Sequence, residues 1–213
     1  MASRIVAPAA TLVIVAVLVV AATLVIAAAL STAAPAGAGP VDTPGYAKAF
    51  TCSACHGDAG QSLSDAMPII AGIAPAYFKK AIADYASGRR VSTEMEPYAK
   101  MVTELGVDDV AGYFAAQPRR PTAVKVDAAA VARGKTASTA CASCHGADGG
   151  GDAAKLVPDL RGQPPGYLRT QMLLFKAEKR SPGDEPLKAV KAVMRTISDE
   201  TFTDLAAYYS TLK

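Results

Sequence analysis

The stretches CSACHG at residues 52–57 and CASCHG at residues 141–146 contain every cysteine and every histidine of this 213-residue chain. Cys-x-x-Cys-His is the attachment signature of c-type haem, in which the two thiols bond the porphyrin and the histidine binds the iron. Two copies therefore predict two covalently bound haem c groups. The predicted attachment and iron-binding residues are Cys52, Cys55, His56, Cys141, Cys144 and His145.

Other chemistries also use closely spaced cysteines. Two Cys-x-x-Cys pairs can hold one zinc ion, and a single pair can act as a redox dithiol or form a disulfide. A shared zinc site does not explain why histidine and glycine follow both pairs. The chain lacks the alternating strand and helix pattern of a thioredoxin-like dithiol protein, and a plain disulfide gives the histidines no role. Haem attachment accounts for all of these residues.

The sequence around the two motifs is repeated. Gly45 and Gly134 precede the first cysteine of their motifs by the same seven positions, and residues 67–90 align with residues 157–180. The matched positions are Pro68 with Pro158, Gly72 with Gly162, Pro75 with Pro165, Tyr77 with Tyr167 and Arg90 with Arg180. Such self-similarity indicates two like units. We expect domains at residues 41–118 and 127–213, with a linker at residues 119–126.

Helical patterns fill both units. We expect a helix leading into each motif, with Pro44 in the first turn of one and Asp127 capping the other. A middle helix from residue 75 or 165 and a last helix after Asp108 or Ser198 follow. No stretch alternates like an exposed strand, so the predicted fold class is all-α, with two tandem cytochrome c-type haem domains. Glycine before each motif leaves a notch that a tyrosine of the last helix, Tyr113 or Tyr208, can fill.

The N-terminal region differs from the rest. Residues 5–30 carry no charge, and Arg4 precedes them. A membrane-spanning helix needs about 20 apolar residues, whereas a signal-peptide core has about 7–15, so the run is long enough to span. A signal peptide cleaved within the small residues 34–38 is the alternative. Residues 1–40 are thus expected to form an anchor or signal helix with a linker, placing the rest on the periplasmic side of a bacterial inner membrane.

Methionine is the remaining choice for a sixth iron ligand, because no histidine or cysteine lies outside the motifs. Met194 precedes the last helix of the second unit, and Met101 occupies the matching place in the first, with Met95 as its alternative. Ordinary core packing is the competing interpretation for each. The remaining methionines fit the N-terminal run or packing positions better: Met1, Met67 and Met172.

Arginine and tyrosine near the middle helices are candidates to bind haem propionates. Arg90 and Arg180 follow these helices, and Tyr77 and Tyr167 lie within them. For the charged residues, a solvated helix end explains the pattern equally well.

The order of these motifs resembles the dihaem cytochrome c4 family. Each unit has Cys-x-x-Cys-His-Gly, then Gly-x-x-Pro-x-Tyr, a basic pair, a methionine and an acidic-capped last helix. The chain is also similar to the cytochrome subunit of flavocytochrome c sulfide dehydrogenase. Over residues 42–213 the resemblance implies two cytochrome c folds about a pseudo-twofold axis, with haem edges close enough to exchange electrons. It implies His56 and His145 as proximal ligands and Met101 and Met194 as distal ligands. The chain departs from the family in its long apolar N-terminus and in AGIAP at residues 71–75, where glutamine is frequent.

These features predict an electron carrier and not an enzyme. Such a protein takes single electrons from a quinol-oxidising complex or a dehydrogenase and passes them to a terminal oxidase or another acceptor of a respiratory chain. The alternatives are a non-catalytic cytochrome subunit of a larger oxidoreductase, and a dihaem peroxidase-like enzyme with a displaceable sixth ligand. The net charge of +3 is too small to suggest a nucleic acid partner.

Overall fold

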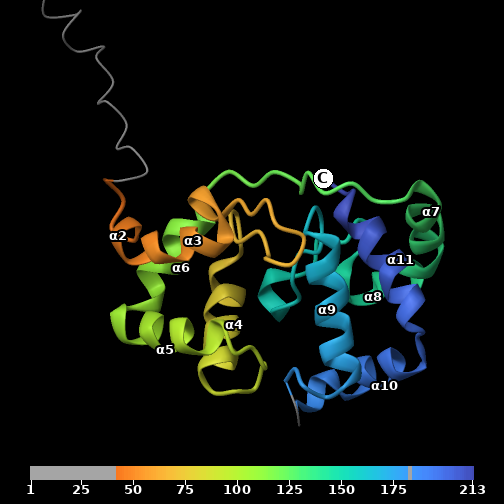
Figure 1. Ribbon diagram of the computed structural model, residues 1–213. Coiled ribbons are helices and arrows are strands. Elements are labelled where there is room, and N and C mark those ends of the chain that lie inside the picture. The colour runs from red at the N-terminus through yellow and green to blue at the C-terminus, as the bar shows by residue number, and fades with distance from the viewer. Residues whose placement is uncertain (1–41, 182–183) are drawn as a thin grey trace, which may run out of the picture. The chain divides into compact units, whose positions relative to one another are not determined.

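The computed structural model describes residues 42–181 and 184–213, and the regular structure in these ranges is helical (Figure 1). Its β features there are two isolated bridges, Arg90 with Arg180 and Asp152 with Val157. The predicted all-α class is confirmed for this part of the chain. Among the described residues, no helix has both the length and the apolar character needed to cross a membrane. The expected membrane segment, residues 5–30, lies outside them.

The first half, residues 42–118, has five α-helices and two 3-10 segments within its described residues. They are α2 (Tyr46–Ala49), η2 (Phe50–Cys52), α3 (Ser53–His56), η3 (Asp58–Gly60), α4 (Pro75–Ala86), α5 (Met95–Leu105) and α6 (Val107–Ala115). The motif helix is thus continuous in direction, with one tighter turn at η2 before α3.

The second half, residues 127–213, repeats this order with one additional 3-10 segment before α10, over the residues that the structure describes. Its elements are α7 (Ala128–Ala137), η4 (Ser138–Ala140), α8 (Ala142–His145), η5 (Ala153–Lys155), α9 (Pro165–Lys176), η6 (Glu185–Leu187), α10 (Lys188–Thr196) and α11 (Asp199–Ser210). By position, α4 corresponds to α9, α5 to α10 and α6 to α11.

Predicted helix starts are partly confirmed. The Asp127 carboxylate accepts from the Ala130 amide at 3.0 Å and caps α7, and the Ser198 hydroxyl accepts from the Thr201 amide at 3.1 Å and caps α11. The prediction for Pro44 was wrong, because α2 begins at Tyr46 with Gly45 as its N-cap. Helices α5 and α10 were not predicted. Pro97 masks the pattern of α5, yet it lies in the first turn, where a missing amide hydrogen costs nothing.

Each half has its own apolar core. The core of the first half includes Phe78, Val102, Val110 and Phe114, all at most 5% exposed. The core of the second half is smaller and consists of Leu168, Phe202, Leu205, Ala206 and Tyr209. Half-buried apolar side chains surround the second core. So small a core ordinarily needs a further stabilising group to complete it.

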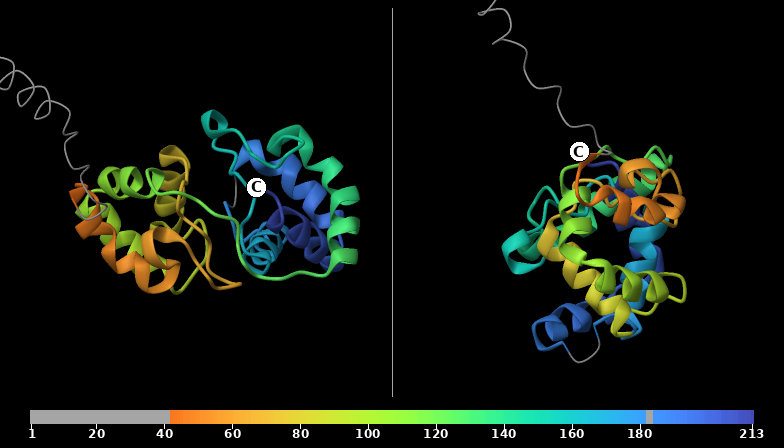
Figure 2. Two further views of the ribbon diagram at one scale, coloured as in Figure 1. Left: turned by 90° about the horizontal axis from the view of Figure 1, so that it is seen from above. Right: turned by 90° about the vertical axis from the view of Figure 1, so that its left-hand side faces the viewer.

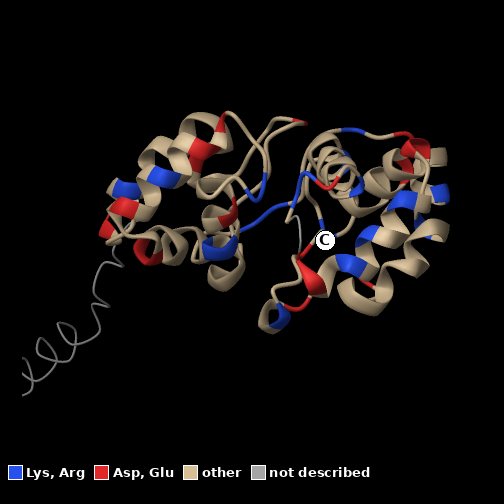
Figure 3. Ribbon diagram, turned by 90° about the horizontal axis from the view of Figure 1, so that it is seen from below, with Lys and Arg blue, Asp and Glu red and all other residues tan. Residues whose placement is uncertain are grey.

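The chain between the two halves runs from one to the other as an extended segment (Figure 2), and hydrogen bonds join the halves at several further places. The Gln163 side chain donates to the Ile69 carbonyl at 2.7 Å and accepts from the Ile69 amide at 3.0 Å. The Asp65 carboxylate accepts from the Gly166 amide at 2.7 Å, which caps α9 from the opposite half. The linker residue Thr122 donates its amide to the Gly162 carbonyl at 2.8 Å. Basic and acidic residues are interspersed along both halves (Figure 3).

Candidate haem sites

The two histidines have the same hydrogen-bonding partner. His56 Nδ1 lies 2.9 Å from the Pro68 carbonyl oxygen, and His145 Nδ1 lies 3.0 Å from the Pro158 carbonyl oxygen. A carbonyl oxygen only accepts, so Nδ1 carries the proton and the lone pair of Nε2 remains to bind a metal. Burial lowers the pKa of both imidazoles and keeps them neutral, as ligation requires. Pro68 and Pro158 are matched positions of the sequence repeat, but the sequence analysis did not predict that their carbonyl oxygens bind the histidines.

Glycine is required on both sides of each motif. Gly57 and Gly146 end the motif helices at φ +77°, a conformation that other residues rarely adopt. A Cβ on Gly45 would lie against the Asp109 carbonyl oxygen and 2.7 Å from Tyr113 Cβ. A Cβ on Gly134 would lie against the Asp204 carbonyl oxygen and 2.8 Å from Tyr208 Cβ. The predicted notches, and the tyrosines that fill them, are confirmed.

The cysteines of the two motifs belong to different cores. Cys52 packs against the core of the first half and Cys141 against that of the second, so the pairs do not converge on one zinc. None of the four thiols is in a disulfide in the described part of the chain. Burial raises the pKa of Cys52 and Cys141. An activated redox dithiol has the opposite shift, because it needs a thiolate at neutral pH.

The residues present fit a haem in each half. An oriented imidazole, buried for His56 and half-buried for His145, lies beside one half-buried and one exposed cysteine, and half-buried methionines border the core of each half. In the first half these methionines are Met95 and Met101, both on α5, and in the second half they are Met172 on α9 and Met194 on α10. A haem in each half would find there the two kinds of iron ligand, histidine and methionine, that electron-transfer cytochromes use.

The four residues predicted to bind propionates meet each other across the halves. Arg90 Nη2 donates to the Tyr167 hydroxyl at 2.8 Å, and Arg180 Nη2 donates to the Tyr77 hydroxyl at 2.6 Å. The side chains of Arg90 and Arg180 are buried, at 3% and 8% exposure for the whole residues. Within the described residues, neither arginine forms an ion pair with a carboxylate. Burial would raise the pKa of Tyr77, but the charges of Arg180 and Arg90 lower it.

Gln171 is a residue of this network that the sequence analysis missed. Its side-chain oxygen accepts from Arg90 Nε at 3.0 Å, from Arg90 Nη2 at 2.6 Å and from Arg180 Nη1 at 2.9 Å. The repeat places Ala81 at the matching position of α4. The break in the repeat was therefore visible in the sequence, but only the structure shows that one glutamine serves both arginines.

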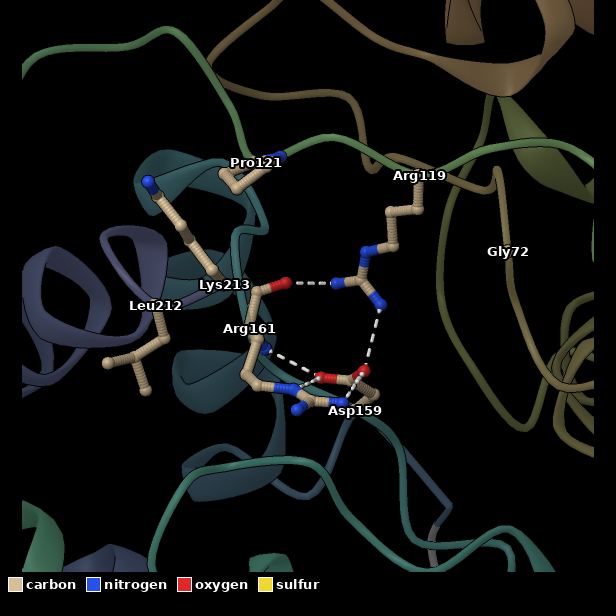
Figure 4. A pocket seen from close by; sticks show the side chains of 7 residues that line it. All are labelled: Gly72, Arg119, Pro121, Asp159, Arg161, Leu212 and Lys213. Atoms are coloured by element: carbon tan, nitrogen blue, oxygen red, sulfur yellow. Dashed lines mark hydrogen bonds and ion pairs between the residues drawn. The ribbon is translucent and has the colours of Figure 1, made fainter.

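A cavity of about 290 Å³ lies where the linker meets the second half (Figure 4). Arg119 reaches across it to the Arg161 carbonyl oxygen and lies 3.3 Å from the Asp159 carboxylate, which Arg161 also binds at 2.9 Å. No predicted haem residue lines this cavity. The arginines that line it are already paired, and the contacts of Arg119 attach the linker to the second half.

Comparisons with known proteins agree with this geometry. The Cytochrome c family model matches residues 131–213. Cytochrome c4 of Thiocapsa roseopersicina is 31% identical over 173 residues, which cover 77% of this chain and 88% of that protein. The thiosulfate dehydrogenase electron acceptor of Stutzerimonas stutzeri is 30% identical over 174 residues, covering 76% of this chain and 79% of that protein.

A structural comparison and a shorter sequence match extend this. The crystal structure of reduced recombinant cytochrome c4 from Pseudomonas stutzeri matches with a TM-score of 0.70 at 25% identity, over 79% of this chain and 97% of that one. The cytochrome subunit of sulfide dehydrogenase from Chlorobaculum tepidum is 35% identical over 74 residues, covering 35% of this chain and 66% of that protein. Both expected resemblances are confirmed. The chain belongs to the cytochrome c4 family, the electron carriers with two covalently bound c-type haems.

Proposed function

We propose that this protein carries single electrons between redox proteins through one haem in each half, within domains at residues 41–118 and 127–213. Cys52 and Cys55 attach the first haem and Cys141 and Cys144 the second. His56 and His145 are the proximal iron ligands, and Met101 and Met194 the distal ones. Each bound haem supplies an iron that takes up one electron as it goes from ferric to ferrous and releases it on return.

The observation that carries this proposal is the duplicated histidine geometry. Hydrogen bonds of 2.9 and 3.0 Å from Nδ1 to matching proline carbonyls orient both imidazoles in the same way. Such a bond fixes the ring and raises the basicity of Nε2. A ring fixed in this way would need little reorganisation when the charge of a bound iron changes, which suits electron transfer.

Arg90 and Arg180 are proposed to bind propionates. Two buried guanidinium groups without a carboxylate partner in the described structure are costly unless an anion joins them. Their neighbours Tyr77, Tyr167 and Gln171 are neutral, so the local charge stays positive. Propionates from both haems would supply the missing negative charge between the halves.

Intact-mass measurement of the native chain tests the haem content. Two haem increments are expected, and a Cys141→Ser, Cys144→Ser double variant should retain one. Carbon monoxide added to the reduced wild-type protein should not bind, because methionine occupies each sixth position. Rapid binding at one haem would support the peroxidase-like alternative over the carrier.

The partners and location belong to the same proposal. The donor is a quinol-oxidising complex or a dehydrogenase, the acceptor a terminal oxidase or another cytochrome, and the protein lies on the periplasmic side, held through residues 5–30 or released by cleavage. Relatives that are an electron acceptor of thiosulfate dehydrogenase and a subunit of sulfide dehydrogenase support a second candidate, a non-catalytic subunit of a larger oxidoreductase. A large complex that survives high salt during purification would favour the second candidate.

A further inference from the structure

Helix α10, which carries Met194, is attached to the second half in an unusual way. Its one buried residue is a lysine, Lys191, which is 2% exposed. The apolar residues on the same helical face, Leu187, Val190 and Met194, are only half-buried. A charged side chain therefore supplies the most buried contact of this helix.

Lys191 is satisfied by the loop that follows α9. Its Nζ donates to the Glu178 carboxylate at 2.8 Å and to the Ser181 carbonyl oxygen. Glu178 also accepts from Arg195 Nη1 at 2.8 Å. Lys191 and Arg195 lie one helical turn apart, with Met194 between them in the sequence. The Glu178 carboxylate thus binds the residues at both ends of the helical turn that contains Met194, the proposed iron ligand.

The same loop contacts the first half. The Ser181 amide donates to the Arg89 carbonyl oxygen at 2.6 Å, and the Val91 amide donates to the Lys179 carbonyl oxygen at 3.2 Å. Residues 178–181 are therefore held by the opposite half on one side and hold α10 on the other. Glu178 and Ser181 adopt φ of +57° and +49°, a conformation kept only where surrounding contacts fix it.

Helix α5 of the first half, which carries Met95 and Met101, is attached differently. Ala99 and Val102 bury its apolar face, at 0% and 2% exposure. Its ion pair, Lys100 with Glu96 at 2.6 Å, lies within the helix and is exposed at both ends. The most buried contacts of α5 are apolar, whereas the most buried side chain of α10 is Lys191, which binds the half-exposed Glu178.

We propose that Lys191 and Glu178 are positioning residues that keep Met194 on the iron of the second haem, so that this ligand depends on the loop at the boundary of the halves. The first haem has no equivalent dependence. This inference rests on the proposed assignment of Met194. A redox partner that displaces residues 178–181 would then loosen the ligand of the second haem alone.

The test variants are Glu178→Gln and Lys191→Gln. The control is Glu96→Gln, a matched change in the exposed ion pair of α5. Met194→Leu is the reference for a lost ligand. The ferric absorption band that arises from methionine bound to haem iron is measured together with carbon monoxide binding to the reduced protein. Haem content shows that each variant has folded. The Lys191 and Glu178 variants should lose up to half of the band and bind carbon monoxide at about one haem per chain. Amide exchange in α10 should become about tenfold faster, with no change in α5.

Each result has a distinct meaning. Loss of half of the band in Met194→Leu, together with a wild-type band and no carbon monoxide binding in both Glu178→Gln and Lys191→Gln, would overturn the positioning role and leave the ligand assignment standing. A full band in Met194→Leu would overturn both. Equal losses in Glu96→Gln would also contradict the inference, because the effect would then be general to ion pairs on these helices.

Discussion

Arg90 of the first half donates to the hydroxyl of Tyr167 in the second half at 2.8 Å, and the matching pair, Arg180 and Tyr77, makes the same bond in the reverse direction at 2.6 Å. Each arginine also lies over an aromatic ring of its own half, Arg90 4.4 Å from the centre of Tyr85 and Arg180 4.5 Å from that of Phe175. The crossed pairing makes each half necessary for the hydrogen bonding of the other.

Replacement of Tyr167 by phenylalanine should destabilise the protein by about 1.5 kcal/mol, the low end for a hydrogen bond to a charged group. The low end applies because Arg90 keeps its two bonds to Gln171. Denaturant unfolding of the haem-containing protein measures the change. Tyr98→Phe, at an exposed tyrosine of α5, is the control and should stay within about 0.5 kcal/mol of wild type. Equal effects of the two changes would show that the crossed bond contributes nothing.

Gly45→Ala should cost about 1–3 kcal/mol, because the new Cβ meets Tyr113 Cβ at 2.7 Å and the Asp109 carbonyl oxygen. Gly112 lies on the same helix as Tyr113, and a Cβ there would have no atom within 4 Å. Gly112→Ala should therefore stabilise the protein by about 0.5–1 kcal/mol through backbone entropy. Thermal unfolding of both variants provides the measurement. If Gly45→Ala left the stability unchanged, α2 and α6 would be able to move apart at no cost in free energy.

Met101 and Met95 can be distinguished by parallel leucine substitutions. Met101→Leu should remove the methionine-to-iron band of the first haem and lower the reduction potential of one of the two haems, because a thioether ligand raises it. Met95→Leu should change neither, since a volume-conserving swap at a packing position is tolerated. Redox titration followed at the haem bands measures both potentials. The reverse pattern would assign Met95 as the ligand.

The contribution of Glu178 should depend on pH. The hydrogen bond from Lys191, with the charges of Lys191 and Arg195, holds the pKa of Glu178 below its ordinary value. A lowered folded-state pKa means that the stabilisation is complete above the unfolded-state value of about 4.3 and is lost as the pH falls through the folded-state value. Glutamine cannot ionise. The difference in unfolding free energy between wild type and Glu178→Gln should therefore be largest near neutral pH and disappear in acid. A difference independent of pH would contradict this.

Much of the haem site follows from local sequence. Cys-x-x-Cys-His-Gly forms one helical turn that ends at a glycine with positive φ, so the order of the side chains already sets the relative positions of thiols and imidazole. The capping roles of Asp127 and Ser198 are equally local. Pro44 was placed wrongly because a proline before an N-cap and one in the first turn give the same sequence signal.

Contacts between distant residues could not be predicted in the same way. The sequence placed Arg90, Tyr77, Arg180 and Tyr167 near one cofactor group, but not their crossed pairing or the central place of Gln171. The carbonyls of Pro68 and Pro158 were missed because backbone acceptors have no residue signature. The sequence also left Lys191 unremarked, since a lysine on a short helix is ordinarily solvated.

The sequence by itself determined that two like helical units each present a Cys-x-x-Cys-His turn, because the motif consists of a few consecutive residues and occurs twice. Only the tertiary structure decided how the units differ. The sequence shows glutamine at position 171 and alanine at 81, but only the fold shows that Gln171 binds both arginines. The polar attachment of α10 and the apolar attachment of α5 likewise depend on which side chains meet in the folded chain. Packing between elements breaks the symmetry of the repeat, since each half forms part of the surroundings of the other.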